Sequence, residues 1–160
     1  MTNKSLENYL LQNKINLIRT DVGDRNVTKS MKEKGFILGG EQSGHIILNK
    51  YSSTGDGILA SLEVLGIMMV QNKKLSSLAN IYEPYPQIIQ NFPIKASQES
   101  KNIINHVKSK IKKFIGKKNA RLIIRKSGTE NTIRTMSEAK DIELAKSISA
   151  EIINLMKEKI

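Results

Sequence analysis

All three prolines of this 160-residue chain lie between positions 84 and 93, close to the middle of the sequence. Proline has no backbone N–H and cannot continue a helix or a central strand, so a proline cluster interrupts regular structure. The apolar pattern also changes character across this stretch. We therefore expect two units, residues 1–80 and 81–160, joined near positions 79–86. Each unit has roughly enough residues for one small domain.

The first half of the chain has the pattern of an α/β unit. Apolar residues recur at helical spacing over residues 3–13 and 58–71, which we predict as helices, and a short helix over residues 26–34 is expected to stop at Gly35. Three short apolar runs predict strands over residues 15–20, 36–40 and 46–49. The last two of these strands are separated by a polar loop, so we expect them to pair as a hairpin.

The second half has the pattern of a small α+β unit. Strands are expected over residues 120–125 and 132–139, with a further strand over residues 86–95 that Pro93 either breaks or places at an edge. Two amphipathic helices are expected, one after a Ser97 cap and one after an Asp141 cap. The prediction for this half is therefore antiparallel strands with two helices on them.

The net charge of the chain is +11, from 26 Lys and Arg against 15 Asp and Glu. Such a charge permits a polyanion as partner, but aromatic residues are only 4% of the chain and do not interleave with the lysines. Nucleic acid is therefore not the expected partner. The absence of Cys excludes disulfides, thiolate metal sites and thiol nucleophiles. No apolar run reaches membrane-spanning length and no secretory signal begins the chain, so we expect a cytoplasmic protein without membrane association.

The sharpest candidate site is the segment RKSGTENTIR, residues 125–134. Its potential phosphate ligands are two guanidinium forks, two hydroxyls and a glycine that opens the backbone: Arg125, Arg134, Ser127, Thr129 and Gly128. The alternative is an ordinary Ser-Gly turn with surface arginines. Only five of the 26 basic residues are arginines, and two of them flank this loop. That scarcity favours phosphate binding.

A second candidate is the loop GGEQSGH, residues 39–45. After Gly40 it offers a carboxylate, a hydroxyl and an imidazole from Glu41, Ser43 and His45, groups that can hydrogen-bond sugar hydroxyls. An ordinary polar hairpin loop explains the spacing equally well.

Two further loops contain one aspartate each, VGDR at residues 22–25 and TGDG at residues 54–57. A hard divalent cation needs several oxygen ligands, so neither aspartate is predicted to bind metal. We expect Asp24 to fix its turn and the position of Arg25. Asp56 is expected to help start the helix that follows it.

The four motifs VGDRNV, GGEQSGH, STGDGI and RKSGTENTIR, in this order, resemble the C-terminal part of the α-D-phosphohexomutases. The resemblance covers essentially the whole chain. It implies that residues 1–80 form a truncated third domain for sugar recognition, an α/β/α mixed-sheet domain without its first strand. It implies that residues 81–160 form the fourth, phosphate-binding α+β domain. The Gln of GEQSGH and the VGDR context are most similar to the branch that acts on glucosamine phosphate.

The resemblance also implies roles for individual residues. The expected sugar-binding set is Glu41, Ser43, His45, Gly40, Asp24 and Arg25, with His45 near the reacting phosphate. The expected ligands of the non-transferred phosphate are Arg125, Ser127, Gly128, Thr129 and Arg134. The family's two prolines in this loop are replaced by Lys126 and Asn131, which implies a less rigid loop.

The family reaction uses a phosphoserine loop and a loop of three aspartates that holds Mg²⁺, and neither motif is present in the sequence. The resemblance therefore assigns no catalytic residue, metal ligand or bound cofactor to this chain, and no mutase turnover is expected from it alone. Mg²⁺ and a hexosamine bisphosphate activator are implied for the complete enzyme. The implied partners are a phosphosugar and a separate N-terminal chain carrying the phosphoserine and metal domains. The alternatives are a phosphomannomutase or phosphoglucomutase fragment, and a non-catalytic phosphosugar- or polyanion-binding module.

Overall fold

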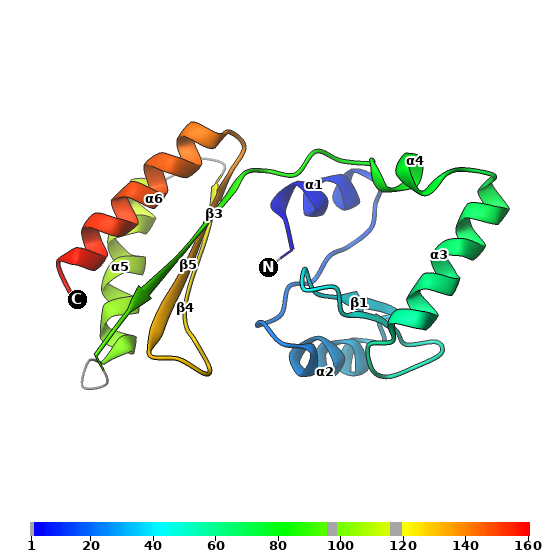
Figure 1. The fold of residues 1–160 in the computed structure, drawn as a ribbon, viewed down its shortest axis with the longest axis horizontal. Helices are drawn as coiled ribbons and strands as arrows, with labels where there is room; N and C mark the ends of the chain where they lie inside the picture. Colours follow the sequence, from blue (N-terminus) through cyan, green and yellow to red (C-terminus); the bar gives the residue numbers. More distant parts are fainter. Residues whose placement is uncertain (1, 96–98, 116–119) are drawn as a thin grey trace. The chain divides into compact units, whose positions relative to one another are not determined.

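The computed structural model describes residues 2–95, 99–115 and 120–160, and the chain divides into two compact units (Figure 1). Unit 1 is Met1–Glu83 and unit 2 is Pro84–Ile160. Unit 2 thus begins at the first of the three prolines. Both units combine helices with a small antiparallel sheet, which agrees with the predicted mixed α/β class. No helix among the described residues has both the length and the apolar character needed to cross a bilayer.

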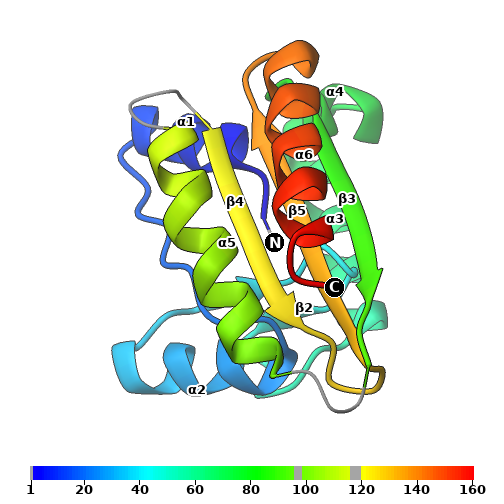
Figure 2. The same ribbon diagram turned by 90° about the vertical axis from the view of Figure 1, so that its left-hand side faces the viewer.

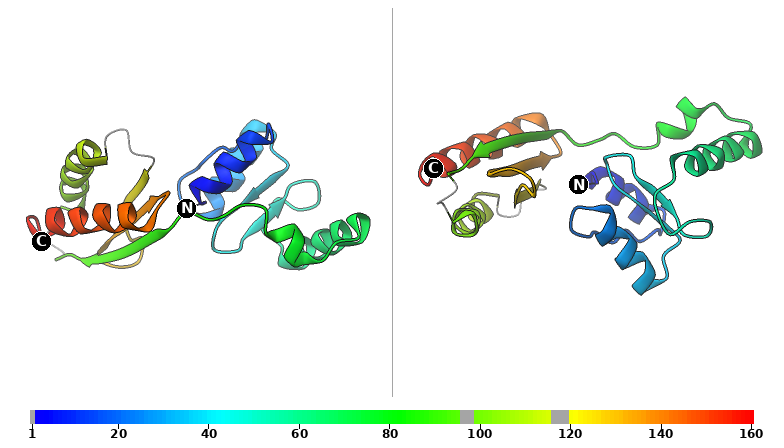
Figure 3. Two further views of the ribbon diagram at one scale, coloured as in Figure 1. Left: turned by 90° about the horizontal axis from the view of Figure 1, so that it is seen from above. Right: turned by 60° about the horizontal axis from the view of Figure 1, so that its bottom comes forward.

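Unit 1 is built around one short β-hairpin. Its helices are α1 (Lys4–Gln12), α2 (Asp24–Lys34), α3 (Gly57–Gln71) and α4 (Leu75–Ala79), and its strands are β1 (Leu38–Gly40) and β2 (Ile46–Leu48). The two strands pair antiparallel with Gly39 opposite Ile47, which confirms the predicted hairpin. Figure 3 shows α3 leading away from this hairpin. The short helix α4 was not predicted, because no helical pattern was assigned to the residues that follow α3.

Local signals set the ends of these helices. The Asn3 side chain accepts a hydrogen bond from the backbone N–H of Ser5 and starts α1, and Asp56 does the same for α3 by accepting from Leu59. Helix α2 ends at Gly35, whose φ of 69° is in the left-handed region that glycine adopts without strain. Each of the three helices predicted in this half is therefore confirmed, with boundaries that differ by one or two residues.

The strand predicted over residues 15–20 is wrong. The backbone there joins no ladder, and Ile15 and Ile18 are about half exposed. Instead, the Arg19 guanidinium donates to the Glu7 carboxylate at 2.8 Å and to the Thr2 carbonyl at 2.7 Å, which ties the segment to α1. A run of β-branched residues favours extended backbone, but a strand also needs a neighbouring strand to pair with, and none lies beside this segment in the described residues.

Unit 2 is a three-stranded antiparallel sheet with two helices. Its elements are β3 (Gln87–Pro93), α5 (Ser100–Ile115), β4 (Ala120–Lys126), β5 (Thr132–Ala139) and α6 (Ile142–Lys157), and the strand order is β3-β5-β4. Figure 2 shows α5 and α6 on the same face of the sheet. Pro93 ends the edge strand β3, as predicted. The Asp141 cap is confirmed, with its carboxylate 2.7 Å from the Leu144 nitrogen, whereas the predicted Ser97 cap lies outside the described residues.

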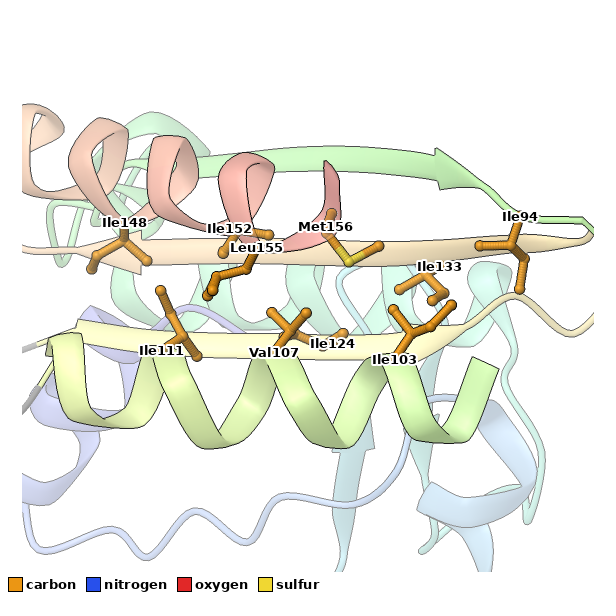
Figure 4. Close-up of a cluster of buried hydrophobic side chains, with 10 residues drawn as sticks. All are labelled: Ile94, Ile103, Val107, Ile111, Ile124, Ile133, Ile148, Ile152, Leu155 and Met156. Atoms are coloured by element: carbon orange, nitrogen blue, oxygen red, sulfur yellow. The ribbon is translucent and has the colours of Figure 1, made fainter. Parts of the chain in front are cut away.

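The core of unit 2 lies between the helices and the sheet (Figure 4). Helix α5 contributes a stripe at i, i+4 and i+8 spacing, from Ile103 through Val107 to Ile111, and all three are buried. The side chains that meet this stripe come from α6, from strands β4 and β5, and from the residue that follows β3: Ile148, Ile152, Leu155, Met156, Ile124, Ile133 and Ile94. Both helices therefore cover one face of the sheet, and neither covers the opposite face.

Candidate functional site

The two arginines of the phosphate-binding candidate lie side by side on the sheet. Arg125 on β4 and Arg134 on β5 are direct cross-strand partners. Their chain neighbours Ile124 and Ile133 are buried in the core under the helices, so alternation along the strands places both arginines on the sheet face that the helices leave open. Like charges in directly opposite positions repel each other. An anion held between the two guanidinium groups would relieve that repulsion.

The loop between the two strands closes tightly. The Ser127 N–H donates to the Thr132 carbonyl at 2.8 Å, and the Ser127 side chain is buried. Gly128 and Thr129 are exposed, and a Cβ added at Gly128 would meet no atom within 4 Å. The loop thus leaves open space beside exposed hydrogen-bonding groups. The five predicted phosphate ligands are brought together at one end of the hairpin.

Glu130 joins this group, and sequence reasoning did not assign it a role. Its Oε2 accepts a hydrogen bond from Nη2 of Arg134 at 2.9 Å, and both side chains are exposed. Another nitrogen of the same guanidinium, Nε, is buried and has no hydrogen-bond partner in the part of the chain that the structure describes. The site therefore holds two cations and one carboxylate. The sequence signal for this ion pair was the position of Glu130, an acidic residue four positions before Arg134.

The sugar-binding candidate gathers two loops of unit 1. Oε2 of Glu41 accepts a hydrogen bond from the Gly23 N–H at 2.9 Å, which fixes the VGDR turn beside the GEQSGH loop. Gly23 has a φ of 121°, a conformation that side chains other than glycine rarely adopt. Asp24 accepts from the Arg25 N–H at 2.7 Å, and the Arg25 side chain is exposed at the start of α2. The role predicted for Asp24, fixing its own turn, agrees with this bond.

His45 also belongs to the sugar-binding candidate. Its Nδ1 lies 3.0 Å from the Ser43 hydroxyl oxygen and 3.9 Å from Oε1 of Glu41, and the imidazole is exposed. Gly40 permits this arrangement because a Cβ there would lie 3.1 Å from the His45 carbonyl oxygen. The TGDG loop also approaches, since a Cβ on Gly55 would lie 3.7 Å from the imidazole. Carboxylate, hydroxyl and imidazole thus converge on the surface of unit 1.

An ion pair with a fully buried carboxylate lies on the face of the unit 2 sheet opposite the helices and was also missed from the sequence. Glu138 is fully buried, with Oε1 3.4 Å from Nε of Arg121, and the Gln87 amide donates to its other oxygen. These three residues are direct neighbours across β3, β5 and β4. Only two arginines lie outside the motifs, Arg19 and Arg121, and each pairs with a glutamate. In a chain with so few arginines, an arginine outside the motifs was the sequence signal for a specific ion pair.

The sequence also matches models of known families. Residues 1–85 match phosphoglucomutase/phosphomannomutase alpha/beta/alpha domain III, and residues 72–155 match the C-terminal domain of the same family. The chain is 43% identical over 150 residues to phosphoglucosamine mutase of Zymomonas mobilis, covering 92% of this chain and 33% of the relative. It is 40% identical over 160 residues to phosphoglucosamine mutase of Bartonella quintana, covering 98% of this chain and 34% of the relative.

The fold is similar to solved structures of this class. N-acetylphosphoglucosamine mutase of Aspergillus fumigatus superposes with a TM-score of 0.83 and 17% identity, over 99% of this chain and 37% of that protein. A phosphoglucomutase/phosphomannomutase family protein of Burkholderia thailandensis gives a TM-score of 0.76. The chain spans about a third of the length of the curated relatives that it matches. By its two domain matches and its sequence identity to these relatives, the chain belongs to the phosphoglucomutase/phosphomannomutase family, also called the α-D-phosphohexomutases.

Proposed function

We propose that this chain supplies the sugar-binding and phosphate-holding loops of a phosphoglucosamine mutase, which interconverts glucosamine 6-phosphate and glucosamine 1-phosphate. The observation that carries the proposal is the cross-strand pair Arg125 and Arg134, two guanidinium groups on the sheet face opposite the helices, next to a loop with exposed residues at Gly128 and Thr129. The names of the relatives, at 40 to 43% identity, support the choice of sugar. The activity belongs to the complete enzyme, of which this chain provides part of the binding machinery.

In this proposal the phosphate is held by unit 2. The two guanidinium groups donate to the phosphate oxygens in a charge-assisted, bidentate manner, which fits a dianion better than a single ammonium does. The hydroxyls of Ser127 and Thr129 and the backbone near Gly128 add further donors. The incoming dianion competes with the Glu130 carboxylate for Arg134. This part of the reaction is positioning, because the phosphate held here is the one that is not transferred.

The sugar is held by unit 1 in this proposal. One oxygen of Glu41 already accepts from Gly23, and an ionised carboxylate has further lone pairs for sugar hydroxyls. Ser43 orients the imidazole of His45 through Nδ1, which leaves Nε2 to donate to, or accept from, an oxygen of the substrate. Gly40, Asp24 and Arg25 complete the set by shaping the two loops.

The remaining chemistry is proposed to come from outside this chain. In the complete enzyme, Mg²⁺ would stabilise the charge of the phosphoryl group in transfer. In the described residues, no three His, Asp or Glu side chains gather as a metal-ligand set. The phosphoserine and the Mg²⁺ loop, whose sequence motifs this chain lacks, are proposed for a partner polypeptide that carries the N-terminal domains, and the bisphosphate activator for the complete enzyme.

Alanine substitutions in the phosphate site test the proposal. Arg125→Ala and Arg134→Ala should each weaken binding of glucosamine 6-phosphate by about 1.5–3 kcal/mol, as expected for a lost hydrogen bond to a charged group. Isothermal titration calorimetry on the full chain measures this change. Lys112→Ala is the matched control, because Lys112 is an exposed cation on α5 outside the site. Equal losses from all three substitutions would mean that a diffuse basic surface binds the sugar phosphate.

A competition series tests the choice of sugar. Glucosamine 6-phosphate should displace a bound phosphosugar more effectively than glucose 6-phosphate or mannose 6-phosphate. Preference for glucose 6-phosphate would favour the phosphoglucomutase alternative, and preference for mannose 6-phosphate would favour the phosphomannomutase alternative. Both activities appear in the name of the matching family. A gel shift at low ionic strength tests the polyanion alternative, since phosphate contacts make nucleic-acid binding strongly salt-dependent. We expect no retention of nucleic acid.

A further inference from the structure

Helix α3 is apolar around its whole circumference and buries none of its side chains. Its 15 residues include a single charged one, Glu63, whereas Ile58 is 77% exposed and Val70 is 87% exposed. A helix of this composition normally lies inside a larger protein body, because a surface helix has a polar side. Exposed apolar surface of this extent marks an interaction site.

The exposed surface continues into a groove. Apolar side chains of α3, α4 and the segment after α4, together with Tyr9 of α1, line a hollow of about 480 Å³. The apolar residues that form it are Val64, Ile67, Leu75, Leu78 and Ile81. Its walls are suited to receiving apolar side chains from another segment. Helix α3 and this groove form one continuous surface, which we call the α3 surface.

The hairpin of unit 1 also has an unpaired edge. In the part of the chain that the structure describes, β1 pairs with β2 alone, and Leu38 on β1 is 64% exposed. Such an edge presents backbone N–H and C=O groups that can pair with an added strand. Unit 1 therefore offers two kinds of complementarity, apolar contact on the α3 surface and strand pairing at β1.

The chain as a whole exposes more area than two folded domains of its size would. Two independent folded domains, each of half this mass, are expected to expose about 9,700 Å² together. The protein exposes 11,072 Å². The chain thus exposes about 1,400 Å² more than two folded domains of its size would, and α3, which buries no side chain, is among the elements that contribute to this excess.

We propose that the α3 surface is the docking site of the polypeptide that makes up the rest of the relatives' length. This inference rests on the proposed function. The curated relatives are about three times as long as the matched region, and their domain III is matched here beside the C-terminal domain. A second copy of this chain is the less suitable occupant, because each copy carries a net charge of +11 and two copies repel. The docked polypeptide contributes apolar side chains to the α3 surface and a strand to β1.

Association of two separately produced chains tests this proposal. The probe is the two thirds of the Zymomonas mobilis phosphoglucosamine mutase that lie outside the matched region, mixed with the full 160-residue chain. Analytical ultracentrifugation should detect a one-to-one complex. Leu62→Ser combined with Met69→Ser should weaken association at least about tenfold. Ile142→Ser is the matched control, because Ile142 is an exposed apolar helical residue of unit 2. It should leave association unchanged.

The variants are expected to fold, because α3 buries none of its side chains in the isolated chain. Circular dichroism checks this point, and phosphate binding by unit 2 provides an independent measure of the proposed function. Retained association of the double variant, or no complex with the unmodified chain at 100-fold excess of the probe, would overturn the docking proposal. Self-association that the double variant abolishes would identify a second copy as the occupant and also overturn it. Lost phosphate binding with intact association would instead reject the proposed function.

Discussion

Helices α3 and α6 have similar local features and opposite surroundings. They contain 15 and 16 residues, and each begins at an aspartate whose carboxylate accepts a backbone N–H, Asp56 in α3 and Asp141 in α6. In α6, six residues are buried, including Ile148 and Ile152, whereas α3 has none. The difference arises because α6 packs along a three-stranded sheet and α5, whereas α3 meets only the two-stranded hairpin, at β2, and the short α4. A cap and a helix-forming composition are therefore enough to form a helix, but they do not determine whether its side chains are buried.

The same contrast extends to the two units as wholes. In the described residues, buried hydrophobic side chains of unit 1 are only Met31 and Ile47, and 16 of the 19 large hydrophobic residues that are exposed belong to this unit. In unit 2, ten buried residues form one cluster between helices and sheet. Burial of apolar surface is the main stabilising contribution to folding. Unit 2 should therefore be stable by itself, and unit 1 should depend on what covers it.

The largest expected effect comes from truncating one isoleucine in each helix. Ile152→Ala in α6 should lower the free energy of unfolding of unit 2 by about 2–5 kcal/mol, because it leaves a cavity in the core. Ile58→Ala in α3 should change stability by less than about 0.5 kcal/mol, because that side chain is exposed. Urea denaturation followed through the NMR signals of each unit measures both values. Similar losses would show that α3 is buried in solution.

Hydrogen exchange should separate the units without any substitution. Backbone amides of residues 1–50 should exchange at least about tenfold faster than those of residues 120–155, because local opening costs less where few apolar contacts form. Adding the polypeptide that we propose as partner should slow exchange at residues 36–49. Equal protection in the isolated chain would mean that the hairpin of unit 1 is stable without a partner.

The two helix caps offer a smaller, matched comparison. Asp141→Ala should destabilise unit 2 as a whole by about 1 kcal/mol, because α6 is part of its core. Asp56→Ala removes an equivalent cap, but its effect should remain within α3 and appear as reduced helix content by circular dichroism. Asp141→Asn and Asp56→Asn retain a capping oxygen and should have little effect. A loss of cooperativity in unit 2 after Asp56→Ala would contradict the independence of the two units.

The smallest expected effect is a pH dependence confined to unit 1. Burial by itself raises the pKa of Glu7, but hydrogen bonds from Arg19 and Lys4 outweigh it and hold that pKa below its ordinary value of 4.5. The ionised form is therefore favoured by folding, and its contribution is present above pH 4.5 and lost as the pH falls through the lowered pKa. Thermal melting of unit 1 between pH 6 and pH 3 measures this loss. Arg19→Ala should remove most of it, and Arg25→Ala should not.

Local sequence signals predicted most of the secondary structure. The aspartate caps, Gly35 at the end of α2, and the Gly-containing loop between β1 and β2 act within a few residues, so the sequence indicates them directly. The strand over residues 15–20 could not be judged in this way, because pairing depends on which segment lies alongside. The same limitation hid the Arg19 contact with Glu7, which joins residues 12 positions apart.

For the candidate site too, some features follow from the sequence and others only from the tertiary structure. The sequence by itself determined which residue types occupy the two loops and, through the order of four motifs, the family to which the chain belongs. Only the tertiary structure placed Arg125 opposite Arg134, joined Glu41 to Gly23, and buried Glu138 beside Arg121. The Arg125–Arg134 pairing depends on the register of one hairpin, whereas the other two contacts depend on packing between segments farther apart in the chain. Composition alone does not fix such register or packing, because the hydrophobic pattern and the turn select a register only when one face of the sheet is buried against the core.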